Sequence, residues 1–150
     1  MKRYIIPTII LFFGSTLWAQ SDAVFTVVED MPRFSGCEAY YDSLAQELNR
    51  ESNLKAEREK CAMKKLVEFL SQIEYPEEAK KEKKEGKAFL RFVIDTDGRV
   101  INTEIARSTG HTILDNAALD YLNSSPKWIP GKQRGNPVKV QFVVPVNFSL

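Results

Sequence analysis

The sequence is poor in the residues that most metalloproteins and hydrolases need. It contains 1 histidine and 2 cysteines among 150 residues, so a metal site built from several histidines is excluded. It also lacks the G-x-S-x-G and H-E-x-x-H motifs and any glycine-rich phosphate loop. We therefore expect neither an enzyme nor a protein that carries a metal or another cofactor.

An excess of charge of either sign is also missing. Lys and Arg number 21 against 20 Asp and Glu, which gives a net charge of +1. Loss of an N-terminal segment carrying Lys2 and Arg3 would change this to +1 − 2 = −1. Neither value favours binding to nucleic acid or to an anionic membrane surface. With 43% hydrophobic and 27% charged residues, the composition is typical of one ordinary globular domain with short additions.

One acidic turn imitates a calcium loop. Part of the EF-hand pattern is matched by Asp95, Asp97, Gly98, Val100 and Glu104. The first calcium ligand would be Val93, which has no oxygen to offer, and both flanks alternate like strands rather than helices. We interpret the turn as a β-hairpin in which Gly98 supplies the positive φ.

One short stretch contains the residue types of a catalytic triad. Ser108, His111 and Asp115 lie close together in the sequence, directly before a helical pattern over 113–123. Turn and capping chemistry explains them better, because Thr112 and Asp115 have the spacing of a capping box. We expect a helix start there and no catalytic role.

The first 20 residues have the pattern that is typical of a secretory signal. Lys2 and Arg3 precede an apolar run over 4–13, and Ala19 suits the last signal position. An uncleaved inner-membrane anchor is the alternative, although the apolar run is shorter than the ~20 residues that a spanning helix needs. Either reading places the rest of the chain outside the cytoplasm.

The extension that follows, residues 21–61, contains both cysteines. Export favours a disulfide between Cys37 and Cys61, which would contribute roughly 3–4 kcal/mol in the chain-entropy model. A reactive thiol is the alternative, but it needs a nearby base or a C-x-x-C context, and neither is visible. We expect the stretch between the cysteines to be polar, partly helical and wholly solvated.

Residues 62–150 predict a mixture of helices and strands. Apolar residues recur at helical spacing over 62–73, and Tyr75-Pro76 ends that helix and begins a short second one. The further expected elements are a strand over 87–95, a returning strand over 99–107, the helix over 113–123 and a strand over 138–148.

The last of these strands is the most informative. Apolar and polar residues alternate along it without a break, which predicts one face packed on a core. Pro145 has no N–H for a ladder, so we expect an edge strand with Pro145 directed toward the open side. The residues in the same phase should then also turn their backbones outward: Lys139, Gln141, Val143 and Asn147. Such an edge is suited to pair with an extended peptide, or with a second copy of this chain in a homodimer.

The order of the motifs resembles the TonB C-terminal domain family over residues 62–150, in a stand-alone, Bacteroidetes-type periplasmic version. The motifs that carry the resemblance are Tyr75-Pro76-x-x-Ala79, Gly86 opening a strand, Asp97-Gly98-Arg99-Val100, the Ser108–Gly110 loop, Leu114-Asp115-x-x-Ala118, Trp128-x-Pro130-Gly131, Gly135-x-Pro137-Val138 and, upstream, Met31-Pro32-Arg33-Phe34-x-Gly36-Cys37.

The resemblance implies an α+β domain, in which helices pack on one face of a three-stranded antiparallel sheet. It also implies a function: in the periplasm, the family binds the short N-terminal "TonB box" of outer-membrane transporters, which adds as a strand beside the last strand. By position, Gln72 and Tyr75 would contact this partner as well. Full-length members carry a Pro-rich spacer before the domain, whereas residues 21–61 here have no polyproline character.

Overall fold

A computed structural model describes residues 23–48 and 54–150; the expected signal segment, residues 1–20, lies outside them. The helices are α1 (Glu38–Leu48), α2 (Lys55–Leu70), α3 (Glu77–Lys81) and α4 (Thr112–Asn123). The strands are β1 (Val24–Phe25), β2 (Gly86–Ile94), β3 (Val100–Arg107), β4 (Gly131–Gln133) and β5 (Asn136–Phe148). The strands and helices predicted for residues 87–148 are therefore confirmed, with small changes at their ends.

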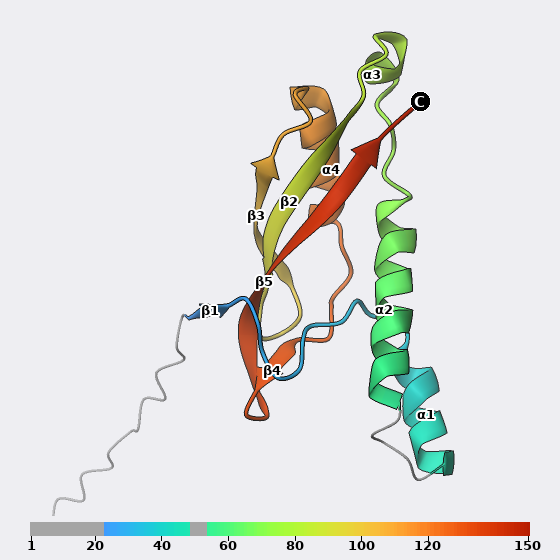
Figure 1. The fold of residues 1–150 in the computed structure, drawn as a ribbon, viewed down its shortest axis with the longest axis vertical. Helices are drawn as coiled ribbons and strands as arrows, with labels where there is room; N and C mark the ends of the chain where they lie inside the picture. The colour runs from blue at the N-terminus through green and yellow to red at the C-terminus, as the bar shows by residue number, and fades with distance from the viewer. Residues whose placement is uncertain (1–22, 49–53) are drawn as a thin grey trace, which may run out of the picture.

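The centre of the fold is an antiparallel sheet of β3, β2 and β5, as predicted (Figure 1). β2 lies in the middle and pairs with β5 along its whole length, from Gly86 opposite Phe148 to Ile94 opposite Val140. The short strand β1 adds to the other side of β5 in parallel, and β4 forms a hairpin with the beginning of β5. The sheet therefore ends at β3 on one side and at β5 with β1 on the other.

Both longer helices of the domain pack on one face of this sheet. Leu66 of α2 and Leu114 and Leu122 of α4 belong to the same buried cluster as the inward residues of β2 and β5. Phe69 of α2 and Tyr121 of α4 stack with ring centroids 4.6 Å apart. Burying each large apolar side chain of this kind contributes about 1.5–3 kcal/mol. The predicted α+β class, with helices on one face, is confirmed.

The hairpin predicted at Asp95–Gly98 is present. The N–H of Gly98 donates to the carbonyl of Asp95 at 2.9 Å, and Gly98 has φ +84°. A Cβ at this position would lie 2.0 Å from the carbonyl oxygen of Trp128. Gly98 is therefore required both by the turn and by the close approach of the chain that leads into β4.

The N-terminal segment is part of the same packed unit. Residues 26–37, called the strap below, run from β1 across the base of the sheet toward α2 (Figure 1). Asp30 bridges to Lys132 and Arg33 to Ile129, and Phe34 packs with its ring centroid 5.2 Å from those of Phe69 and Trp128. The strap thus contributes an aromatic side chain to the core.

The disulfide expected between Cys37 and Cys61 is confirmed, and it joins the end of the strap to α2. The expectation that the residues between these cysteines are wholly solvated is wrong. Leu54 is buried, and α2 begins at Lys55 rather than near residue 62. Charged residues dominate the first turns of α2, so the spacing of apolar residues that indicates a helix is not visible there. The disulfide and the Arg58–Asp42 ion pair of 2.8 Å hold α1 against α2.

Candidate functional site

The two ends of β5 differ in what lies beside them. Over residues 136–140, called the covered half, β4 pairs with 136–138 and β1 pairs with Lys139 and Val140. Over residues 141–148, called the open half, the only pairing among the described residues is with β2. The predicted edge position of β5 is therefore confirmed for the open half, while this chain's own β1 occupies the edge at Lys139.

The outward face of the open half is accessible. Val143 is 48% exposed and Pro145 and Asn147 are exposed, whereas Val144, Val146 and Phe148 between them are buried in the core. This alternation is the one that the sequence predicts. It leaves a strand whose inward side chains are buried and whose outer edge is unpaired among the described residues.

The register indicates which backbone groups reach that edge. Pro145 lies opposite Phe89 of β2. Because proline has no N–H to exchange with β2, this pair occupies a non-hydrogen-bonded position, and the residues two positions away share that phase. The backbone N–H and C=O groups of Gln141, Val143 and Asn147 are thus directed away from β2, toward the open edge.

The connector between α2 and α3, residues 71–76, holds the other two predicted contact residues. Gln72 is exposed, and Tyr75 is partly buried with its ring 5.6 Å from that of Phe148 in an edge-on arrangement. The Tyr75 hydroxyl donates to the carbonyl of Lys84, and burial followed by the Glu85 carboxylate raises the pKa of this hydroxyl. Tyr75 therefore has a clear structural role at the far end of the open half.

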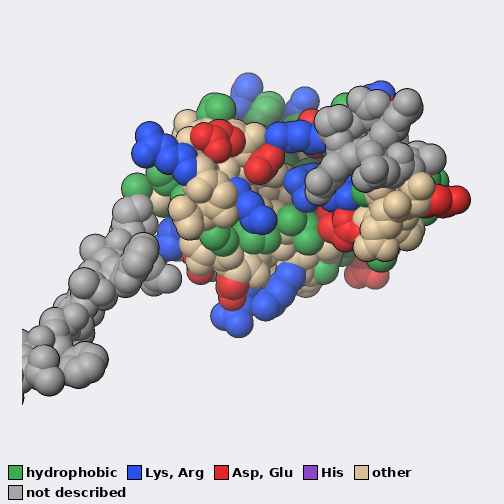
Figure 2. All heavy atoms as spheres, turned by 90° about the horizontal axis from the view of Figure 1, so that it is seen from below, with side chains coloured by type: hydrophobic (Ala, Val, Ile, Leu, Met, Phe, Trp, Pro, Cys, Tyr) green, Lys and Arg blue, Asp and Glu red, His purple; other side chains and the backbone are tan. Residues whose placement is uncertain are grey.

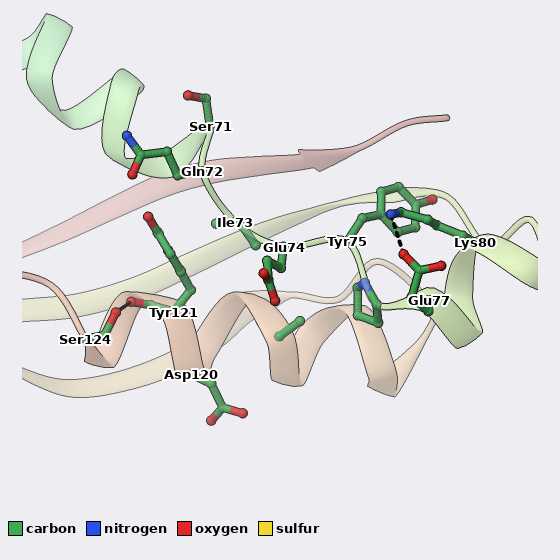
Figure 3. A pocket seen from close by; sticks show the side chains of 12 residues that line it. Ser71, Gln72, Ile73, Glu74, Tyr75, Glu77, Lys80, Asp120, Tyr121 and Ser124 are labelled. Atoms are coloured by element: carbon green, nitrogen blue, oxygen red, sulfur yellow. Dashed lines mark hydrogen bonds and ion pairs between the residues drawn. The ribbon is translucent and has the colours of Figure 1, made fainter.

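A broad hollow lies between this connector and α4. It has a volume of about 1040 Å³, and its lining includes Gln72 and Tyr75 of the connector and Tyr121 and Ser124 of the α4 side. Figure 3 shows Gln72 and Tyr75 at opposite ends of the connector, with Glu77 and Lys80 joined by an ion pair of 2.6 Å beyond Tyr75. The structure thus links Tyr75 to β5 through Phe148 and places Gln72 at the other end of the connector, on the side of Tyr121 (Figure 3).

The predicted capping box at the start of α4 is wrong. His111 precedes the helix without a side-chain cap, and the Asp115 carboxylate accepts hydrogen bonds from Ser108 Oγ at 2.5 Å and from the N–H and Oγ1 of Thr109 at 2.9 Å each. Burial by itself raises the pKa of the Asp115 carboxyl, yet these hydrogen bonds and the neighbouring His111 outweigh it and hold the pKa below its usual value. Asp115 therefore fixes the loop before α4.

This loop does not form a catalytic triad. The Ser108 hydroxyl donates its hydrogen bond to the Asp115 carboxylate. The hydrogen bonds of His111 to this loop are made by its backbone: its N–H donates to Thr109 Oγ1, and its C=O accepts from the same hydroxyl. A base positioned on the serine is the first requirement of that chemistry. Within residues 23–48 and 54–150, no group of acidic residues, histidines or cysteines is placed to hold a metal ion.

The face of the molecule at the β4 end carries charges of both signs (Figure 2). Figure 2 shows Lys and Arg side chains interspersed with Asp and Glu around hydrophobic side chains at the end of the molecule where β4 lies. Such a mixture provides no extended field of one sign for nucleic acid. In the part of the chain that the structure describes, none of the helices combines the length and the apolar character needed to cross a bilayer.

Two pairings that hold the N-terminal segment beside β5 and β4 were not predicted from the sequence. The pairing of β1 with β5 was hidden, because β1 is only 2 residues long and its partner is distant in the sequence. The strap–β4 bridges were also missed. The short apolar run at residues 24–28 was the only local signal for them.

Comparison with known proteins points in one direction. The family model described as the C-terminal region of the Gram-negative bacterial TonB protein matches residues 71–150. Protein TonB of Pseudomonas putida is 33% identical over 79 residues, which are 51% of this chain and 32% of that protein. Protein TonB of Haemophilus influenzae is 35% identical over 83 residues, which are 55% of this chain and 30% of that protein. The chain thus aligns with about a third of each relative's length.

Solved structures give related matches. A solution structure of the Helicobacter pylori TonB C-terminal domain is 27% identical, with a TM-score of 0.45, over 58% of this chain and 90% of that one. A longer piece of the same domain is 25% identical, with a TM-score of 0.47, over 72% of this chain and 92% of that one.

Proposed function

The chain belongs to the family of Gram-negative bacterial TonB C-terminal domains, and from this membership we propose that it captures an extended segment of an outer-membrane transporter in the periplasm. The family is a protein-interaction domain and not an enzyme. The proposed partner is the N-terminal segment of a TonB-dependent transporter, which would add as a strand to the open half of β5. The secretory signal expected in residues 1–20 supports a location in the cell envelope.

The single observation that carries this proposal is the open half itself. β5 is 13 residues long, and its last 8 residues, 141–148, pair only with β2 among the described residues. The phase set by Pro145 turns the donors of Gln141, Val143 and Asn147 outward, so an added peptide would receive up to three N–H donors and skip one at Pro145.

The predicted contact residues have different parts in this proposal. Gln141, Val143 and Asn147 would supply the backbone ladder, Tyr75 borders the far end of the open half through Phe148, and Gln72 lines the hollow beside the connector. Lys139 lies opposite Val24 of β1, so its backbone becomes available to a partner only when β1 is displaced. The proposed footprint therefore begins at Gln141.

An NMR titration tests this footprint. The probes are synthetic peptides that cover the N-terminal segments of the outer-membrane transporters encoded in the same genome. We expect amide shifts and slowed hydrogen exchange at Gln141, Val143 and Asn147 with at least one peptide. Shifts confined to other surfaces would contradict strand addition, and no shift with any peptide would contradict the proposed partner.

A matched pair of variants isolates the backbone donor at the centre of the open half. Val143→Pro removes an outward N–H in the phase that already tolerates Pro145, and we expect about tenfold weaker peptide binding. Val143→Thr keeps the N–H and the branched shape, so its affinity should change less than about twofold. Equal affinities of the two variants would show that no ladder forms at this residue.

The same edge could pair with a second copy of the chain, and light scattering separates the two cases. Our proposal expects a monomer at micromolar concentration that forms a one-to-one complex with peptide. A constitutive dimer that persists with peptide present would instead assign the open half to self-association.

A further inference from the structure

A mostly apolar cavity of about 280 Å³ lies between the strap and α2. Its floor is formed by Trp128 and by Phe142 of β5, and Met63 of α2 forms part of its wall. The remaining lining residues are Met31, Pro32, Arg33 and Phe34 of the strap and Glu59, Ala62 and Leu66 of α2. Apolar groups dominate the lining, while Arg33 and Glu59 bring charge to it.

α2 exposes two large apolar side chains beside this cavity. Met63 and Val67 are each 59% exposed, on a helix whose other exposed residues are mostly Lys and Glu. They lie four residues apart and so share one side of the helix. Neighbouring exposed apolar side chains next to an apolar hollow are typical of a surface that a partner covers.

The cavity begins where the open half begins. β1 pairs with β5 only as far as Val140, and Phe142 follows two residues later with its side chain on the helix-covered face. A strand added from Gln141 onward directs every second side chain to that same face. A side chain of the added strand opposite Phe142 would therefore lie on the same face as Phe142, which lines the cavity together with Trp128 and Met63.

We propose that this cavity is a subsite for one large aliphatic or aromatic side chain of the peptide that pairs with the open half. This inference rests on the proposed function, because the peptide strand must bring the side chain to the cavity. An apolar occupant is favoured, since few polar groups line the cavity to compensate the loss of water by a polar side chain. All lining residues except Trp128 and Phe142 lie outside residues 71–150, so the subsite belongs to the N-terminal extension of this chain rather than to the part that matches the family.

The methionines provide a specific reporter of occupancy. The chain has 3 methionines, of which Met31 and Met63 line the cavity and Met1 belongs to the expected signal segment. The experiment labels the methionine methyl groups with ¹³C and the backbone with ¹⁵N. It titrates the tightest-binding transporter peptide, followed by versions in which each apolar residue is replaced in turn by Ala.

We expect the methyl signals of Met31 and Met63 to shift together with the amides of the open half. One Ala replacement should abolish the methyl shifts and weaken binding about tenfold, while the amide shifts at Val143 persist. Amide shifts without methyl shifts would overturn the subsite and leave the proposed function standing. Methyl shifts without amide shifts would overturn strand addition and with it the subsite, and the absence of both with every peptide would overturn both proposals.

A variant pair tests the wall of the cavity in binding measurements. Met63→Ser removes an exposed apolar side chain, so the fold should persist while affinity for the parent peptide falls about fivefold to tenfold. Tyr40→Ser removes another exposed side chain, 65% exposed on α1, and should leave the affinity unchanged. The unaltered protein should prefer the parent peptide over the peptide whose Ala replacement abolishes the methyl shifts, and Met63→Ser should abolish this preference. An undiminished preference would contradict the subsite.

Discussion

The covered and open halves of β5 share one strand and one alternating pattern, yet among the described residues only the open half has an unpaired outer edge. In the covered half, β1 occupies the edge at Lys139 and Val140 and the strap packs Pro32 close to Gly131. In the open half, the side chains that face the helices are as deeply buried, but the outer edge is unpaired among the described residues. The comparison teaches that the exposure of this edge depends on what lies beside the strand and not on the strand's own alternating pattern.

The difference also has a covalent component. The strap that follows β1 is joined to α2 by the Cys37–Cys61 disulfide, whereas the connector beside the open half is held by contacts such as that of Tyr75 with Phe148. The covered half is thus bordered by a segment that a disulfide anchors at its end, whereas the open half is bordered by a segment held through noncovalent contacts. The three predictions below alter one half at a time.

The largest effect is expected from removing the disulfide. The double variant Cys37→Ser, Cys61→Ser should lose roughly 3–4 kcal/mol of unfolding free energy, because the unfolded chain is no longer closed over a sequence separation of 24. Urea unfolding measures this loss, and hydrogen exchange at Val140 should accelerate more than exchange at Val144. Reducing agent should destabilise the unaltered protein to the same extent and leave the variant unaffected. A loss below about 1 kcal/mol would show that the strap is held by packing alone.

An intermediate effect is expected from Asp115, which supports the far end of the open half. Asp115 holds Thr109, and a Cβ at Gly86 would lie 2.7 Å from the Thr109 carbonyl oxygen, so the loop packs tightly where β2 meets Phe148. Asp115→Asn should cost about 1–2 kcal/mol, since the charged acceptor of these hydrogen bonds is lost. Exchange should rise near Gly86 and Phe148 and remain slow at Val140.

The pH dependence of stability provides the control for Asp115. Its pKa is lowered in the folded state, so its contribution is present above the unfolded pKa of about 4 and is lost as the pH falls through the lower folded value. Asp115→Asn should therefore show a smaller fall in stability between neutral pH and pH about 3 than the unaltered protein. Parallel stability curves for the two proteins would contradict this assignment.

The smallest effect on stability, and the sharpest test of the comparison, comes from removing β1. A chain that begins at Val27 should lose less than about 1 kcal/mol, because β1 is 2 residues long and Val24 is 45% exposed. Exchange at the Lys139 amide should accelerate several-fold, and the footprint of a bound peptide should extend from Gln141 to Lys139. Exchange at Val143 is the internal reference. An unchanged Lys139 amide would show that β1 does not cover this edge in solution.

Local patterns were sufficient to predict most of the fold. Strict alternation predicted β5 and its buried face, Asp95–Gly98 predicted the β2–β3 hairpin, and Pro145 predicted the edge. Each of these depends on side-chain period or on a backbone property of a single residue, so it can be read from neighbours in the sequence. The assignment of the six partner contacts stays a prediction: Gln72, Tyr75, Lys139, Gln141, Val143 and Asn147.

The errors arose where distant residues decide the outcome. α2 begins before its apolar period is visible, because the disulfide and the Arg58–Asp42 ion pair support its charged first turns. Asp115 has the spacing of a capping box, yet its carboxylate accepts hydrogen bonds from Ser108 and Thr109, and the start of α4 has no side-chain cap. Spacing in the sequence could not distinguish between the hydrogen-bond donors that compete for this carboxylate.

The sequence by itself determined the strands of the sheet, the helix-covered face, and the phase in which β5 turns its backbone outward. These follow from alternation and from the missing N–H of Pro145, which no tertiary contact can restore. Only the tertiary structure decided how much of that edge is open and what borders it. The pairing of Val24 with Lys139 and the cavity between the strap and α2 depend on segments far apart in the chain, whose packing no local pattern encodes.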